Sequence, residues 1–173
     1  MRIAIVIPPK DFRDETLKDA LLMLRKWNVR ADITSYSKSS CTGSHGMSVV
    51  PDINTARVHS DDYDGIVFLD GPGVDQYRLF DFRPLLDTTR VFAGKGKIVA
   101  AVGNGIKVIA HTNIINGVKI AEAPDKETSD MVRLYKGVST RREVMSDRNI
   151  ITAKGYGNVM EFIDAILVAA GLR

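Results

Sequence analysis

Cysteine and histidine are scarce in this sequence. Cys41 is the only cysteine among 173 residues, which excludes a disulfide framework and a metal site built from several thiolates. The histidines His45, His59 and His111 have no metal-ligand spacing with one another or with Cys41. We therefore expect no bound metal, and nothing in the sequence calls for a cofactor.

Long hydrophobic runs and a strong excess of one charge are missing as well. The apolar run Ile3 to Ile7 is too short for a signal peptide or a membrane span, and no later segment is long enough. The formal net charge is +3. The densest basic group, Lys136 to Arg142, has no interleaved aromatic residues, which favours a solvated face over a nucleic-acid patch. We expect a cytoplasmic protein with neither a membrane nor a nucleic-acid partner.

What the sequence does contain is enough apolar material for a substantial core. Hydrophobic residues make up 45% of the chain, and no repeat, linker or low-complexity segment divides it. We expect a single domain over residues 1–173.

Apolar strands alternate with helical patterns along the chain, which predicts a mostly parallel sheet covered by helices on both faces. Polar turns indicate two added β-hairpins, and residues 10–13, 70–73 and 124–139 have no predicted helix or strand. The expected strands are Ile3–Ile7, Val29–Ser35, Gly65–Leu69, Ile98–Val102 and Val118–Ala121, and the hairpins fall within Ser37–Pro51 and Glu143–Ala153. The expected helices are Asp14 (as N-cap) to about Trp27, Phe82–Val91, Ile106 onward and Val159–Ala170.

The stretch Lys97 to Ala110 carries the strongest functional signal. A buried strand runs through the turn Gly103-Asn104-Gly105 directly into a helix. Free N–H groups and the positive end of the helix dipole meet at such a turn. Nucleophile elbows and phosphate-binding glycine turns both use this geometry.

Four strings of the sequence resemble one family. They are KGKIVAAVGNGIKVIA, CTGSHGMSVVPD, YDGIVFLDGPG and NIITAKGYGNVMEFIDAIL, in that family's elbow, hairpin, loop and terminal segments. The chain is similar in these segments to the ThiJ/PfpI family of the class I glutamine amidotransferase-like fold. The resemblance implies a flavodoxin-like three-layer α/β/α sandwich with a mostly parallel central sheet. It also implies a homo-oligomer, a dimer or larger.

The resemblance further implies a catalytic set that this sequence does not carry. Members of the family generally use an elbow cysteine, the histidine after it, and a glutamate from the loop after the first strand. These positions fall on Gly103, Asn104 and Arg13, while Glu15 lies two residues beyond the glutamate position at the start of a helix. Glycine offers no nucleophile. We therefore expect a divergent member, a pseudoenzyme without the usual cysteine chemistry.

Three other side chains are candidate replacements. Cys41 lies in the hairpin, far from the elbow, and is expected to be a small semi-buried residue. His45 falls in the hairpin turn, where packing is the simpler explanation. Asp70, at the mouth of the same crevice, could serve as a base or bind a ligand, or cap the loop Gly71 to Gly73.

Three functional hypotheses follow. The first is a regulatory or protective protein that binds a small anionic metabolite, using the guanidinium of Arg13 and the free N–H groups of Gly71 and Gly105. The predicted pocket comprises Arg13, Asp70, Gly71, Gly103, Asn104 and Gly105. The alternative is a hydrolase of the family type (intracellular cysteine peptidase-like, deglycase-like or glyoxalase-like) that uses a non-standard residue such as Asp70. Nucleotide binding is the weakest, because a Rossmann fingerprint needs glycine or alanine where Val108 stands.

Overall fold

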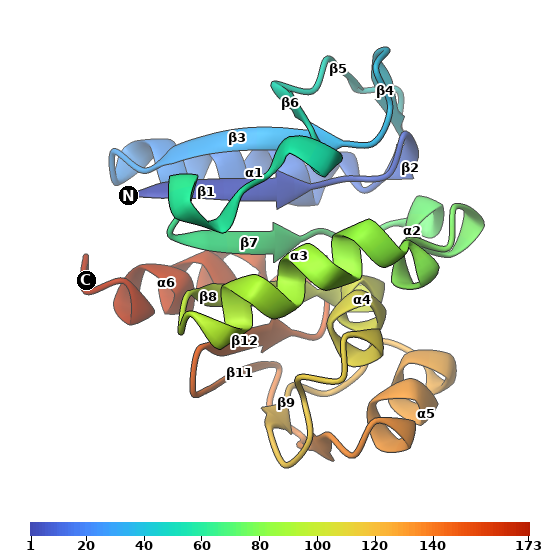
Figure 1. The fold of residues 1–173 in the computed structure, drawn as a ribbon, viewed down its shortest axis with the longest axis vertical. Helices are drawn as coiled ribbons and strands as arrows, with labels where there is room; N and C mark the ends of the chain where they lie inside the picture. Colours follow the sequence, from blue (N-terminus) through green and yellow to red (C-terminus); the bar gives the residue numbers. More distant parts are fainter.

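A seven-stranded sheet forms the centre of the computed structural model, which describes residues 1–173. Every neighbouring pair of strands is parallel except the pair at one edge, where β11 runs antiparallel to β12. Figure 1 shows the strands side by side across the molecule. In spatial order they are β11 (Val144–Asp147), β12 (Ile150–Ala153), β8 (Ile98–Val102), β7 (Gly65–Phe68), β1 (Arg2–Val6), β3 (Arg30–Ser35) and β6 (Ile53–Asn54).

Helices cover both faces of this sheet. One face carries α1 (Asp14–Lys26) and α6 (Val159–Ala169), and the other carries α2 (Pro72–Gln76), α3 (Arg83–Gly94), α4 (Ile106–His111) and α5 (Lys126–Leu134). Short 3₁₀ turns connect them: η1 (Thr55–Arg57), η2 (Ser60–Asp62), η3 (Leu79–Asp81), η4 (Gly103–Gly105) and η5 (Tyr156–Asn158). None of the helices has the length and apolar content needed to cross a membrane.

The core lies in two layers because successive strand residues point to opposite faces. Along β1, Ile3 and Ile5 join the cluster that contains Phe162 of α6, whereas Ala4 and Val6 join the cluster on the α3 face. The predicted flavodoxin-like three-layer sandwich is confirmed.

Two small sheets extend the sandwich. The hairpin of β4 (Cys41–Gly43) and β5 (Ser48–Val49) was expected to extend the main sheet, but β4 pairs with β2 (Lys10–Phe12), a strand in a segment for which the sequence predicts no regular structure. β9 (Lys119–Ile120) pairs in parallel with β10 (Val138–Ser139). The expected hairpin at the carboxyl end is confirmed as β11 and β12.

Two local predictions were wrong, and one segment for which no form was predicted contains a helix. Asp14 does not cap α1: Arg13 is the N-cap, and Asp14 Oδ2 instead accepts the N–H groups of His45 at 3.1 Å and Met47 at 3.0 Å, which anchors the β4–β5 hairpin. The segment after Asp70 becomes a helix at Pro72, which suits a first helical turn. Residues 124–139 contain α5, capped by Asp125.

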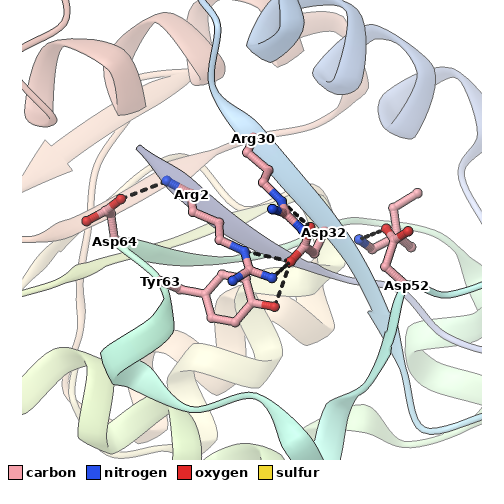
Figure 2. Close-up of polar contacts among 7 residues, drawn as sticks. Arg2, Arg30, Asp32, Asp52, Tyr63 and Asp64 are labelled. Atoms are coloured by element: carbon pink, nitrogen blue, oxygen red, sulfur yellow. Dashed lines mark hydrogen bonds and ion pairs between the residues drawn. The ribbon is translucent and has the colours of Figure 1, made fainter.

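A charged network centred on Asp32 joins β1, β3 and Tyr63, the residue after η2, near the amino ends of the strands (Figure 2). Arg2 Nε, Arg30 Nε and the Tyr63 hydroxyl donate to its carboxylate at 2.8, 3.2 and 2.9 Å. Burial alone would raise the pKa of Asp32, but these hydrogen bonds hold it below its ordinary value. Burial, together with the hydrogen bond to Asp32, raises the pKa of Tyr63 to about 12. The network therefore fixes the end of the sheet away from the carboxyl ends of the strands.

Candidate functional site

A cavity of about 470 Å³ opens at the carboxyl ends of the parallel strands. This is the edge where open α/β sheets bind ligands, at the point where the strand order reverses around β1 and β7. Segments that follow β1, β7, β8 and β12 meet there, together with the β4–β5 turn and the start of α5. The lining residues are Arg13, Ser44, His45, Asp70, Gly71, Pro72, Gly103, Asn104, Pro124, Asp125, Lys154, Gly155 and Tyr156.

Gly103 lies at the turn between β8 and α4, as the sequence predicts. Its φ is +58°, in the left-handed region that glycine adopts without steric cost. A Cβ at this position would lie 2.7 Å from Asp70 Cβ and 3.2 Å from Asp70 Oδ2. The side chain of Asp70 thus occupies the space into which any side chain at position 103 would project.

Asp70 follows β7 and is only 6% exposed. Its backbone carbonyl accepts the N–H of Arg13 at 2.9 Å, which joins the segments after β1 and β7. The buried side-chain Oδ1 has no hydrogen-bond partner. Burial raises the pKa of the carboxyl group, against the opposing effects of the Thr16 hydroxyl and the Arg13 guanidinium. A buried carboxyl oxygen that lacks a donor is costly, which marks Asp70 as a functional candidate.

The side-chain amide of Asn104 pairs with the backbone of Gly71. Asn104 Oδ1 accepts the Gly71 N–H at 3.0 Å, and its Nδ2 donates to the Gly71 carbonyl at 2.7 Å. The expectation of a free N–H at Gly71 was therefore wrong, because the amide takes the place of a ligand there. Asp75 Oδ2, 3.1 Å from the same Nδ2, and buried Lys107, 2.7 Å from Asp75 Oδ1, hold Asn104 in this orientation.

Gly105 belongs to the turn but does not line the cavity. It is buried, and a Cβ there would lie 2.9 Å from the Phe68 carbonyl oxygen and 3.0 Å from that of Leu69. Its role in the structure is to let the start of α4 pack closely on the end of β7.

Arg13 places its guanidinium in the cavity, where it stacks over the ring of Tyr156 at 4.4 Å from the centroid. Its Nε is buried without a hydrogen-bond partner, and Glu15 Oε2, at 3.9 Å, is too far away to accept one. The side chain is 42% exposed. Stacking fixes the planar group, and its terminal Nη groups make no hydrogen bond within the protein.

His45 and Glu15 form a pair at the rim. His45 Nδ1 lies 2.6 Å from Glu15 Oε1, and His45 also lines the cavity, which goes beyond the turn packing expected for it. Glu15 does not itself line the cavity. Cys41 is completely buried in the core, where burial raises the pKa of its thiol. It does not line the cavity.

The predicted pocket did not include Lys154, Tyr156 or Asp125, which also line the cavity. Lys154 and Tyr156 come directly after β12, so the rule that parallel strands end at one edge could have found them. Nothing in the sequence pointed to Asp125, because α5 itself was not predicted. No cluster of His, Cys, Asp and Glu in the chain could hold a metal ion.

Comparison with known proteins agrees with this architecture. The model of the DJ-1/PfpI family matches residues 1–169. An uncharacterized protein of Methanocaldococcus jannaschii is 31% identical over 153 residues, covering 88% of this chain and 74% of that protein. A deglycase of Pyrococcus horikoshii is 24% identical over 151 residues, 87% of this chain and 88% of the enzyme.

The fold has a close counterpart among solved structures. The crystal structure of a ThiJ/PfpI domain protein from Brachyspira murdochii superimposes with a TM-score of 0.92, covering 98% of this chain and 96% of that protein, at 21% identity. At that identity the similarity concerns the fold and carries no statement about activity.

Proposed function

The chain belongs to the DJ-1/PfpI family, and from this premise we propose that it binds a small anionic metabolite without the cysteine chemistry expected at the elbow. The position at which the resemblance places the nucleophile is Gly103, and the single cysteine is buried in the core. Neither residue supplies a thiolate to the cavity. The site retains the shape of an elbow but lacks its reactive group.

The proposal depends on the contacts of the Arg13 guanidinium. This group is held against Tyr156, lines the cavity and has no hydrogen-bonded carboxylate partner. A planar guanidinium presents paired donors that match carboxylate and phosphate oxygens. The cavity volume of about 470 Å³ accommodates a small metabolite.

Thermal denaturation in the presence of inorganic phosphate, succinate and glucose 6-phosphate tests this function. We expect at least one of these anions to raise the Tm, by roughly 5–10 °C at 100 times its Kd. Arg13→Ala should abolish most of that rise, because the charge-assisted hydrogen bonds are lost.

Arg141→Ala is the matched control, since Arg141 is an exposed loop arginine away from the cavity lining. It should leave the ligand-induced rise unchanged. The proposal is wrong if no anion stabilises the protein, or if Arg13→Ala responds like the wild type.

One observation favours a second function, catalysis with Asp70 as general base. Burial raises the pKa of Asp70 above its ordinary value, which is the direction that favours a general base. We expect such an enzyme to turn over a reactive dicarbonyl or a chromogenic peptide, with a loss of roughly 100-fold or more in kcat for Asp70→Asn. Turnover that disappears on further purification, or that persists in Asp70→Asn, would exclude this role.

A further inference from the structure

Most of the charged side chains around the cavity already have partners. Lys154 Nζ lies 3.2 Å from Glu122 Oε2. Asp125 caps α5 and accepts the N–H of Thr128 at 2.7 Å. His45 is paired with Glu15, as described above. These groups are therefore compensated within the protein.

The two charged lining residues that remain have opposite signs. Arg13 has no hydrogen-bonded partner for its Nε, and Asp70 Oδ1 is buried and equally without a donor. Both residues line one cavity, and the nearest carboxylate to Arg13 Nε is that of Glu15 at 3.9 Å, beyond hydrogen-bond distance, rather than that of Asp70. A ligand that complements both must carry a negative and a positive group.

We propose that the ligand is a small zwitterion, whose carboxylate or phosphate binds Arg13 and whose ammonium group binds Asp70. Amino acids and aminoalkyl phosphates are the chemical classes that fit. This inference rests on the anion binding proposed above and adds the second contact point.

An ammonium group fits Asp70 better than a neutral hydroxyl does. Asp70 is 6% exposed, so an unpaired negative charge there is poorly solvated. A hydroxyl supplies one donor and no charge, whereas an ammonium supplies three donors and the missing positive charge. Replacing a lost hydration shell with a paired cation is the usual condition for keeping a carboxylate charged inside a protein.

Matched ligand pairs separate the two contacts. We compare phosphoethanolamine with ethyl phosphate, and alanine with propionate, by isothermal titration calorimetry and thermal denaturation. The members of each pair share the acidic group and differ in the amine. In the wild type, the amine-bearing member of at least one pair should bind about tenfold more tightly or better. In Asp70→Asn this ratio should fall below about threefold, and ethyl phosphate should bind more tightly, because a negative charge has been removed.

Asp62→Asn is the control, since Asp62 is an exposed aspartate of η2 outside the cavity lining, and it should preserve the wild-type ratio. Equal binding of both members of each pair to the wild type overturns the zwitterion inference while anion binding through Arg13 stands. Absence of binding for all four compounds also overturns it, whereas anion binding is judged separately from phosphate, succinate and glucose 6-phosphate. The wild-type ratio decides the matter even if Asp70→Asn fails to fold.

Discussion

Replacing Gly103 with cysteine should destabilise the protein by about 2–4 kcal/mol and should not install a working nucleophile. A side chain at φ +58° pays the left-handed backbone penalty, and its Cβ would lie 2.7 Å from Asp70 Cβ. Asp70 or the backbone of the turn must move to make room. Urea denaturation measures the loss, and alkylation of the new thiol reports its reactivity.

Gly96→Cys is the control that separates the backbone cost of Gly103→Cys from the cost of its contact with Asp70. Gly96 has φ +67°, and nothing lies within 4 Å of the position that a Cβ would take. It should therefore cost only the backbone term, roughly 1–2 kcal/mol. In an Asp70→Gly background, the cost of Gly103→Cys should fall toward the same value. If Gly103→Cys is no more destabilising than Gly96→Cys, Asp70 does not obstruct position 103.

The substitution Gly71→Ala should be at least as damaging, at about 3–5 kcal/mol. Gly71 has φ 142° and ψ 161°, a region that is essentially restricted to glycine. A Cβ there would overlap the Asp11 carbonyl oxygen and lie 2.8 Å from both the Arg13 nitrogen and Phe12 Cα. The displaced segment carries Arg13, so anion binding should weaken together with stability.

Denaturant titration and anion binding, measured on the same Gly71→Ala sample, check this expectation. Gly94→Ala is the control, because Gly94 ends α3 and no atom lies within 4 Å of the place that its Cβ would occupy. It should stabilise the protein slightly, by up to about 1 kcal/mol, and should not weaken anion binding. An unchanged affinity in a destabilised Gly71→Ala protein would show that Arg13 is positioned independently of Gly71.

The central strands of the sheet were predictable from the sequence because they are buried on both faces, whereas the short, half-buried edge strand β6 was not predicted. Ile98–Val102 is an uninterrupted apolar run, and the structure places β8 on those same residues. The turn at Gly103 followed from the same pattern. A strand that is buried on both faces consists of consecutive apolar residues, and such a run is visible in the sequence.

Features that depend on long-range polar contacts were not predictable. Asp14 has the residue type and place of an N-cap, but its carboxylate bonds to the hairpin at His45 and Met47. Asp14 bonds to the hairpin rather than to the start of α1 because the β4–β5 hairpin lies beside it. No local sequence pattern predicts that neighbour. The prediction of a free N–H at Gly71 was wrong for the same reason, since Asn104, which follows a different strand, accepts that N–H.

Residue Arg13 itself was predictable as a site residue, but its stacking on Tyr156 was not, because that contact joins opposite ends of the chain. The roles of the site residues stay predictions, as do the single domain, the homo-oligomer and the cellular compartment. The role of a residue, a partner subunit and a cellular location do not follow from the packing of one chain.

The pairing of Asn104 with Gly71 has a kinetic consequence. Both hydrogen-bonding groups of Gly71 are engaged before any ligand arrives, so this wall of the cavity has little freedom to lose on binding. A preorganised wall spares the entropic cost of ordering a loop. Ligands of similar size should then enter at similar rates, and the site should distinguish them by how long each one stays.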